Sequence, residues 1–404
     1  MKKKVILIVV AVVLLLAILL GVLPTRTSGP VVVERSYDAP IPRVMKNSGA
    51  ELSVDGLYEF SLEGNNYLVS YMDDDFLIFY SSEPMEMDGY LFSSVGYYLY
   101  TFETKEVQPI VAAGWRSGYR ITGDPGFVRE GDKIYFHLTQ ANQTQHFNGE
   151  NRYYSFDCVT GELMLLDTDE TDSYFRGKVT HDGKVYSLNR NTSLLDTLSR
   201  TYVQEFDPET GKLSNVHKEL SVLPFSTGKT LLKIGFFEDT FQLLVQDAKT
   251  GIYYVEFYDT AWKLLRTASL ENFAMDFSPN TATFWKNFLL NSVDSTLYCI
   301  DLSSDSLSFE RFSNRACAQI SGDSPDLLLL FPQVSYTSTP TTELLALTPD
   351  GTVIKYDFDP FGWGDFKFHG VLQSGDHIMF LYFSSKDFRN VYTDLATLES
   401  YQKK

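Results

Sequence analysis

Short runs of alternating apolar and polar residues fill most of the chain after residue 54. A period of two places the apolar side chains on one face of an extended strand, so each run predicts a β-strand with one buried face. The pattern is sharpest at residues 153–163 and 202–213, where two alternating runs flank an Asp and a Thr-Gly pair. An Asp side chain can accept hydrogen bonds from turn N–H groups, and a Gly readily adopts the positive φ of a tight reversal. Each of these two segments therefore predicts a β-hairpin.

The same hairpin pattern recurs along the chain. Another clear copy lies at residues 98–107, and looser copies lie at residues 254–264, 297–307, 344–353 and 391–398. The copies are separated by about 42 to 54 residues, which matches the length of one four-stranded propeller blade. A β-sandwich also contains many strands, but it does not require one hairpin to recur at this period. The sequence therefore predicts an all-β fold, a β-propeller of about seven four-stranded blades. Six or eight blades also fit the pattern, because residues 58–64 resemble a further hairpin.

The beginning of the chain follows a different pattern. Three lysines at positions 2–4 precede an uninterrupted apolar run at residues 5–23. At about 1.5 Å per residue, a helix over this run would be about 28 Å long, close to the hydrocarbon thickness of a bilayer. Basic residues mark the cytoplasmic side of a membrane helix, so we expect a single-pass signal anchor in the cell membrane and an extracytoplasmic C-terminal domain. Secretion after signal cleavage is the alternative, although the apolar run is long for a signal peptide.

These patterns divide the chain into three parts. Residues 1–23 are the predicted transmembrane signal anchor, residues 24–54 an extended stalk, and residues 55–404 the propeller. Several prolines within the predicted stalk disfavour a regular helix there. The β-prone residues 31–33 are an exception, and we expect that they could add a strand to the edge of the domain.

Composition limits the partners of the predicted domain. The formal net charge is −18 at pH 7, and the three lysines at positions 2–4 lie before the predicted transmembrane segment, outside the predicted propeller. The surface of the predicted propeller is therefore acidic. Such a surface repels phosphate backbones and anionic head groups, so we expect no nucleic-acid partner and membrane contact only through the N-terminal helix. Cys158, Cys299 and Cys317 are too few and too widely spaced to indicate a disulfide framework.

The two sharpest hairpins resemble a known repeat. The Phe-Asp-x-x-Thr-Gly-x-Leu segments that begin at Phe156 and Phe206 are similar to those of extracytoplasmic bacterial propellers of the quinoprotein and outer-membrane-assembly types. In that family a tryptophan follows the Thr-Gly turn and docks neighbouring blades. Leu165 and Val216 stand near the corresponding positions here, and no tryptophan lies beside them. The resemblance therefore implies architecture alone, without a quinone cofactor or a role in outer-membrane assembly.

Familiar catalytic and metal-binding motifs are absent from the sequence. It contains no G-x-S-x-G elbow, H-E-x-x-H motif, phosphate-binding loop, paired C-x-x-C motif or EF-hand loop. Residues 73–75 form an Asp-Asp-Asp run whose carboxylates could bind a hard cation, but consecutive residues point in different directions, which favours a solvated loop. The histidines have no shared spacing that would place three of them around a metal. We therefore expect neither a cofactor nor a metal.

Basic residues gather in the segments that we predict to be the innermost strand of each blade. Those segments are residues 113–121, 174–180, 227–234, 272–277, 314–320 and 364–372. Together with adjacent residues they supply the candidate ligand-binding set: Trp115, Arg116, Arg120, Arg176, Lys178, Lys229, Lys233, Arg315, Trp363, Asp365, Lys367 and His369. In an otherwise acidic protein these cations would form a positive funnel that attracts an anionic ligand or an acidic segment of a partner. Alternatively, they form ion pairs with acids of neighbouring blades.

Two classes of function fit these observations. The first is a non-enzymatic binding or scaffold module that holds a partner protein or an envelope glycan at its central funnel. The second is a hydrolase or lyase that acts on a saccharide through funnel carboxylates, with Asp359, Asp365 and Arg116 as candidates. Such an enzyme requires two or three carboxylates within about 5 to 10 Å of one another. The aromatic-rich segment at residues 361–369 would serve either class of function, because its rings can stack on a ligand.

Overall fold

A computed structural model of the chain describes most of the predicted propeller. The described residues are 31–32, 44–45, 58–62, 67–87, 90–111, 119–122, 126–142, 149–169, 178–192, 198–207, 212–222, 227–271, 277–304, 307–333, 343–356, 367–383 and 388–401. The predicted signal anchor at residues 1–23 lies outside these ranges. Within them, no helix is long and apolar enough to cross a bilayer.

Four-stranded antiparallel units follow one another along the first half of the described chain. The first consists of β4 (Tyr67–Met72), β5 (Phe76–Met87), β6 (Tyr90–Thr101) and β7 (Val107–Val111). The next contains β8 (Tyr119–Thr122), β9 (Val128–Glu130), β10 (Lys133–Asn142), β11 (Gly149–Asp157) and β12 (Leu163–Asp169), with β8 and β9 both paired to β10. The third consists of β13 (Lys178–His181), β14 (Lys184–Thr192), β15 (Leu198–Asp207) and β16 (Lys212–Val222).

The second half continues the same order. A fourth unit, β17 (Thr227–Phe237), β18 (Thr240–Asp247), β19 (Tyr253–Asp259) and β20 (Leu264–Ser269), joins the third through pairing of β16 with β17. Next come β21 (Thr283–Trp285), β22 (Phe288–Val293), β23 (Thr296–Asp301) and β24 (Ser308–Ser313). They are followed by β25 (Arg315–Cys317), β26 (Gln319–Ile320), β27 (Leu328–Pro332), β28 (Leu344–Leu347) and β29 (Val353–Tyr356). The last strands are β30 (Lys367–Ser374), β31 (His377–Phe383) and β32 (Phe388–Asp394), before the helix α2 (Leu395–Glu399).

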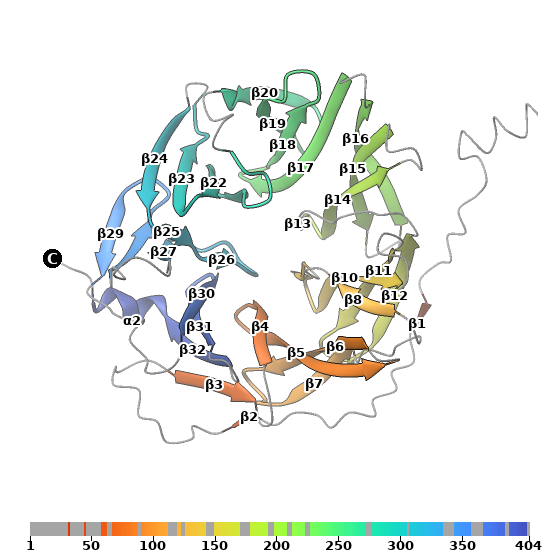
Figure 1. Ribbon diagram of the computed structural model, residues 1–404, viewed down its shortest axis with the longest axis vertical. Helices are drawn as coiled ribbons and strands as arrows, with labels where there is room; N and C mark the ends of the chain where they lie inside the picture. Colours follow the sequence, from red (N-terminus) through yellow and green to blue (C-terminus); the bar gives the residue numbers. More distant parts are fainter. Residues whose placement is uncertain are drawn as a thin grey trace, which may run out of the picture.

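The sheets stand around a central axis, which is the arrangement of a β-propeller (Figure 1). Apolar clusters fill the spaces between neighbouring sheets. One cluster joins β5 and β6 to β10 and β11, and another joins β18 and β19 to β22 and β23. Each sheet thus covers its neighbour's apolar face, as the period-two alternation predicts. The all-β propeller is confirmed.

The recurring hairpin forms the third and fourth strands of most sheets. Residues 153–163, for example, span the end of β11, a turn and the start of β12. In that turn the Asp157 carboxylate accepts hydrogen bonds from the N–H groups of Val159 and Thr160, at 3.0 and 2.8 Å. Gly161 has a φ of +69°. The chemistry that the motif predicts is therefore present.

The last hairpin prediction, at residues 391–398, is wrong in its second half. Strand β32 is followed by α2 and not by a strand. The Asp394 side chain caps this helix by accepting from the N–H of Thr397 at 2.7 Å, and Leu395 and Leu398 are buried beneath it.

The missing strand of the last sheet comes from the other end of the domain. Strand β3 (Tyr58–Leu62) pairs with β32 in an antiparallel register that sets Tyr58 opposite Tyr392. Residues 58–64 are therefore not a further hairpin, because β3 completes the sheet of β30–β32. In addition, β2 (Val44–Met45) pairs with β3, and β1 (Val31–Val32) pairs with β12. The expected edge strand at residues 31–33 is confirmed for Val31 and Val32.

A second connection closes the ring on its inner side. Strand β26 leaves the sheet of β25 and β27 and pairs in parallel with β30 of the next sheet. Beyond β26, Ser321 reaches the first sheet, where its Oγ accepts from the N–H of Met72 at 2.9 Å and lies 3.1 Å from the Met72 carbonyl oxygen, to which it donates. We call residues 318–326 the closing arm, because they join the last sheet to the first.

The inner strands differ in part from the predicted segments. Strands β13, β17, β25 with β26, and β30 overlap the predicted ranges. The predicted segment at 272–277 lies outside the described residues except for Phe277, and the innermost described strand of that sheet is β21, which begins at Thr283. In the β10 sheet, both β8 and β9 border β10, so the inner edge extends beyond the predicted range of 113–121.

Candidate functional site

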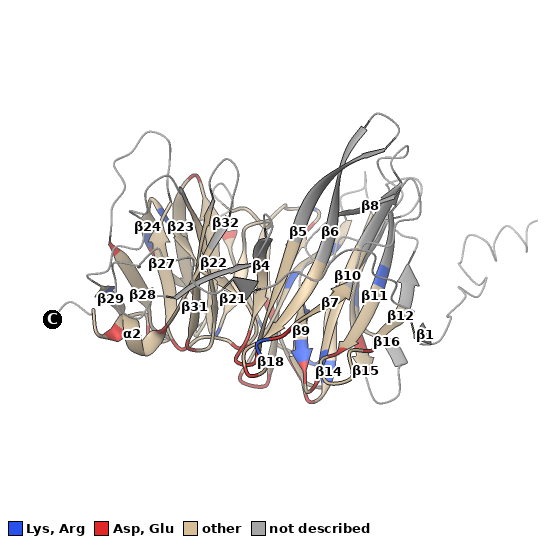
Figure 2. Cartoon of the chain, turned by 90° about the horizontal axis from the view of Figure 1, so that it is seen from below, with Lys and Arg blue, Asp and Glu red and all other residues tan. Residues whose placement is uncertain are grey.

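Carboxylates concentrate in the turns that follow the innermost strands. We call these turns the inner turns; they comprise residues 73–75, 131–132, 182–183, 238–239, 286–287, 321–327 and 375–376. They contain Asp73, Asp74, Asp75, Asp132, Asp182, Glu238, Asp239, Asp323, Asp326 and Asp376, and Lys286 is their one cationic residue. Every inner turn lies within the described residues. Figure 2 shows acidic residues gathered along the lower edge of the disc, where β9, β14 and β18 meet their turns. We call this edge the turn face.

A central cavity of about 1290 Å³ lies beside the inner turns. Its walls are contributed by β4, β9, β13, β17, β21 and β26 and by residues next to them. Apolar wall residues include Phe127, Phe236 and Trp285. The volume exceeds the usual range for small-molecule pockets, about 300 to 1,000 Å³. The cavity is therefore large enough for a polypeptide segment.

Asp73 is the most buried carboxylate of the inner turns, with a relative exposure of 3%. Its Oδ1 accepts from the N–H groups of Asp75 and Phe76 at 2.9 and 3.0 Å, and its Oδ2 accepts from the Tyr71 hydroxyl at 3.2 Å. Burial raises the pKa of Asp73, while these hydrogen bonds and the nearby Arg129 act in the opposite direction. The side chain therefore organises the turn between β4 and β5. The predicted solvated loop is wrong for Asp73.

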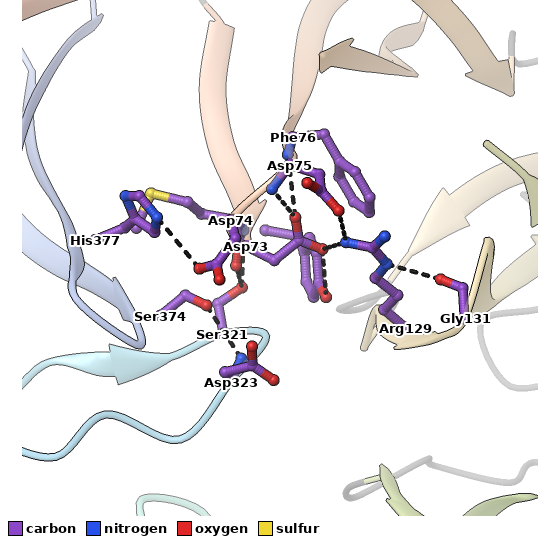
Figure 3. Close-up of polar contacts among 12 residues, drawn as sticks. Asp73, Asp74, Asp75, Phe76, Arg129, Gly131, Ser321, Asp323, Ser374 and His377 are labelled. Atoms are coloured by element: carbon purple, nitrogen blue, oxygen red, sulfur yellow. Dashed lines mark hydrogen bonds and ion pairs between the residues drawn. The ribbon is translucent and has the colours of Figure 1, made fainter. Parts of the chain in front are cut away.

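Arg129 connects this turn to the next sheet. Its Nη1 lies 2.5 Å from an Asp75 carboxylate oxygen and 3.4 Å from an Asp73 carboxylate oxygen, and its Nε donates to the Gly131 carbonyl at 2.8 Å (Figure 3). The guanidinium also lies over the Phe76 ring, 5.0 Å from its centroid. These contacts neutralise Arg129 and hold the first two inner turns together.

The closing arm meets the same cluster from the opposite side (Figure 3). The N–H of Asp323 donates to Ser374 Oγ at 3.0 Å, and the Gly375 N–H donates to the Asp323 carbonyl at 2.9 Å. Between the last sheet and the first, His377 Nε2 lies 3.2 Å from an oxygen of Asp74, whose side chain is 65% exposed. The arm thus places the Asp323 carboxylate at the cavity beside Asp73–Asp75.

Two of the candidate cations, Lys178 and Lys233, line the cavity. The Nζ of Lys178 donates to the Gly126 carbonyl at 2.7 Å and lies 3.1 Å from Nδ1 of His137. An ammonium group can only donate, so this contact keeps Nδ1 unprotonated and the proton of a neutral His137 ring on Nε2. Both lysines lie on inner strands, away from the turns.

Other candidate residues lie elsewhere. The Lys229 ammonium pairs with the buried Glu256 carboxylate, and Arg315 is buried with its guanidinium donating to the Glu343 carbonyl; neither lines the cavity. His369 is exposed on β30. Arg120 and Lys367 belong to β8 and β30, but their side chains are not among those that the structure describes. The remaining candidates also lie outside the described residues: Trp115, Arg116, Arg176, Trp363 and Asp365.

The described cavity wall carries both signs of charge. Sequence reasoning identified the cations of the inner strands but passed over the carboxylates of the turns that follow them. The signal was present, since Asp132, Asp182, Asp239 and Asp376 each stand in a polar turn directly before an alternating strand. Because inner turns converge on the axis, their carboxylates add to the field of the cavity mouth.

The described carboxylates and histidines do not form a metal site. No group of three metal-ligating side chains comes together within the part of the chain that the structure describes. The Asp73 oxygens already accept from backbone and tyrosine donors, and those of Asp75 face Arg129.

The chain matches no protein-family model and no curated protein. Several solved structures are similar to it at low identity. A chain of the mitotic checkpoint complex is 9% identical with a TM-score of 0.46, and the match covers 90% of this chain and 99% of that one. The β-propeller domain of the trilobed protease from Pyrococcus furiosus is 10% identical with a TM-score of 0.44, covering 82% and 97%. The acylaminoacyl peptidase from Pyrococcus horikoshii is 11% identical with a TM-score of 0.45, covering 68% of this chain and 45% of that one.

Proposed function

We propose that the protein is a non-enzymatic binding module whose central cavity, at the turn face, holds a cationic segment of a partner protein. The observation that carries this proposal is the group of inner-turn carboxylates at the turn face, of which Asp73, Asp74, Asp75 and Asp323 line a cavity of about 1290 Å³. Glu238 and Asp239 are exposed, and Asp74 is largely exposed as well. Their field therefore reaches a partner before contact and favours positive charge.

The proposed cavity mouth is negatively charged, whereas the sequence predicted a positively charged funnel. Arg129 is neutralised by Asp73 and Asp75, and the Lys286 ammonium lies 2.6 Å from an oxygen of Asp326. These two cations are thus already paired with carboxylates. An anionic partner would meet the unbalanced carboxylates of the other inner turns first.

The test measures binding of acetyl-pentalysine-amide, which carries positive charge without a terminal carboxylate. We expect the full-length protein to bind it at low ionic strength, with an affinity that falls as salt rises. The variant Glu238→Gln/Asp239→Asn removes two exposed carboxylates from the inner turn that follows β17, and Asn suits the positive φ of 59° at position 239. At about 0.2 to 1 kcal/mol per exposed charge, the affinity should fall about twofold to thirtyfold.

A matched control removes two exposed carboxylates far from the inner turns. Glu271 follows β20, and Asp294 lies in the turn between β22 and β23, so Glu271→Gln/Asp294→Asn reduces the net negative charge by the same amount. We expect this control to leave the affinity almost unchanged. Equal losses in the two variants would mean that only net charge matters, and the proposed site would be wrong.

We also propose that the propeller has seven blades and is held outside the cell membrane by residues 1–23. The count follows from assigning one blade to each inner strand, with β3 completing the last blade.

The proposed membrane anchor rests on the lysines and apolar run of the N-terminal sequence. Membrane fractions should retain the full chain through alkaline carbonate washing, and protease added outside intact cells should remove the propeller. Release by the wash, or protection from the protease, would contradict the anchor or its orientation.

Saccharide hydrolysis has less support in the described part of the chain. The most buried cavity carboxylate, Asp73, accepts hydrogen bonds within the turn that it organises, and Asp75 is paired with Arg129, so neither is available to act on a substrate. We therefore favour binding over catalysis.

A further inference from the structure

Positive and negative side chains are distributed unevenly along the depth of the central cavity. The carboxylates that line it are Asp73, Asp74, Asp75, Glu130 and Asp323, and each lies in or directly beside an inner turn. Lys178 and Lys233 line the same cavity from within strands β13 and β17. Arg129 and Lys286 also line the cavity at the turn face, where both are paired with carboxylates. The described wall therefore has a net acidic charge at the turn face and a basic charge further along the axis.

The strand geometry gives the separation between the two zones. Lys178 lies near the start of β13, which runs toward the turn at Asp182, and Lys233 precedes the turn at Glu238 on β17. At about 3.3 Å per residue, the two lysines lie about 13 Å and 16 Å along their strands from these turns. The lysines are therefore at similar depths on neighbouring inner strands.

The basic zone has a fixed donor. The Nζ of Lys178 is held by the Gly126 carbonyl and by Nδ1 of His137, and His137 is only 6% exposed. A neutral His137 with this Nδ1 contact carries its proton on Nε2, so Lys178 and His137 both present hydrogen-bond donors. His137, Lys178 and Lys233 all line the cavity.

We propose that the occupant of the cavity is the carboxyl-terminal end of a polypeptide, with its terminal carboxylate at Lys178 and Lys233 and with Lys or Arg residues a few positions upstream at the acidic mouth. This inference rests on the proposed binding of a cationic segment and adds the chain end and its direction. An amino acid is too short to contact both zones, whereas about four or five extended residues span 13 to 16 Å. The cavity volume of about 1290 Å³ also suits a segment of this length.

The experiment compares peptides that differ only at the carboxyl end. The probe is acetyl-Lys-Lys-Gly-Gly-Gly-Gly with a free carboxylate, and its counterpart is the same peptide as an amide. We expect the free acid to bind the full-length protein at least about fivefold more tightly, as one charge-assisted contact predicts. A third peptide places a Glu side chain before an amidated end, so that an internal carboxylate can be distinguished from a terminal one.

Variants of the two lysines locate the effect. Lys178→Gln/Lys233→Gln should bind the free acid and the amide equally. It should bind the amide at least as tightly as the unmodified protein does, because two positive charges leave a cavity that binds a cationic peptide, and this binding also shows that the variant is folded. The control Lys218→Gln removes a cation of β16 that lies over the Tyr202 ring, and it should preserve the preference for the free acid.

Each result separates this inference from the proposed function. Equal binding of acid and amide to the unmodified protein would overturn the chain-end inference and leave the cationic site intact. Preference for the internal Glu peptide over the free acid would also overturn it. Failure of every lysine-containing peptide to bind would instead refute the proposed function. A preference for the free acid that survives Lys178→Gln/Lys233→Gln would place the carboxylate elsewhere and contradict the assignment.

Discussion

Gly322 is the residue whose replacement should most directly disturb the closing arm. Its φ is +60°, and a Cβ at this position would lie 2.5 Å from Ser374 Oγ, 2.7 Å from the Met72 carbonyl oxygen and 3.0 Å from the Asp73 Cβ. Ser374 and Met72 are both fully buried. The substitution Gly322→Ala therefore introduces backbone strain and forces the closing arm away from two neighbouring sheets.

The two costs can be separated. An alanine in the left-handed region costs about 1 to 2 kcal/mol, and overpacking of a buried contact costs about 1 to 3 kcal/mol more. Gly251→Ala is the matched control, because Gly251 has a φ of +71° and a Cβ added there would meet nothing within 4 Å. We expect Gly322→Ala to lower the free energy of unfolding by about 2 to 5 kcal/mol, and Gly251→Ala by about 1 to 2 kcal/mol.

Urea unfolding followed by tryptophan fluorescence and by circular dichroism measures both variants. The loss in Gly322→Ala should exceed the loss in the control by at least about 1 kcal/mol. Hydrogen exchange should also rise at β26 and at the turn between β4 and β5. Equal losses in the two variants would refute the close approach of the arm to Met72 and Ser374.

Three further predictions concern other parts of the molecule. Removal of residues 1–63 deletes β3 and exposes the edge of β32. The amides of residues 388–394 should then exchange faster, as measured by hydrogen exchange with mass spectrometry. Unchanged protection would contradict the pairing of Tyr58 with Tyr392. Glu256 is 1% exposed and contacts the Lys229 ammonium and the Tyr258 hydroxyl. Glu256→Leu should therefore lower the free energy of unfolding by about 2 to 4 kcal/mol, and adding Lys229→Met should restore part of the loss. A double variant no more stable than the single one would argue against a coupled pair. Hydrogen bonds from Thr160 and Val159 lower the pKa of Asp157 below its usual value of 3.8, so its contribution to stability is present above that value and is lost as the pH falls through the lower folded pKa. Asp157→Asn should therefore destabilise the protein more at about pH 6 than at about pH 2 in urea unfolding, and an equal effect at both pH values would contradict this linkage.

The repeating hairpins could be predicted from sequence because each is a local structure. The Asp157 turn needs only neighbouring residues to accept and donate its hydrogen bonds. Ring closure could not be predicted in this way. Ser321 and Met72 are 249 residues apart, and no local pattern distinguishes the hydroxyl that joins them. The partner of β3 is equally remote in sequence, so the local pattern at residues 58–64 indicates a hairpin and gives no sign of β32.

The candidate site was predicted in part. Assigning inner strands by alternation identified Lys178 and Lys233, which do line the cavity. The same reasoning grouped Lys229 with them, although its side chain pairs with Glu256 of β19 in the same sheet. A β-strand alternates its faces, so a small error in register moves a side chain from the channel to a neighbouring sheet. The inner-turn carboxylates required the turns to be placed around one axis, and this placement came from the structure.

The central claim is that a cationic segment enters the cavity from the turn face. Hydrogen–deuterium exchange of the full-length protein with and without acetyl-pentalysine-amide tests it most directly. We predict slower exchange at residues 73–76, 131–133 and 237–240, and no change at the turns around Asp247 and Asp294, which connect other strands of their sheets. Protection confined to the latter turns or to the outer strands would contradict the account.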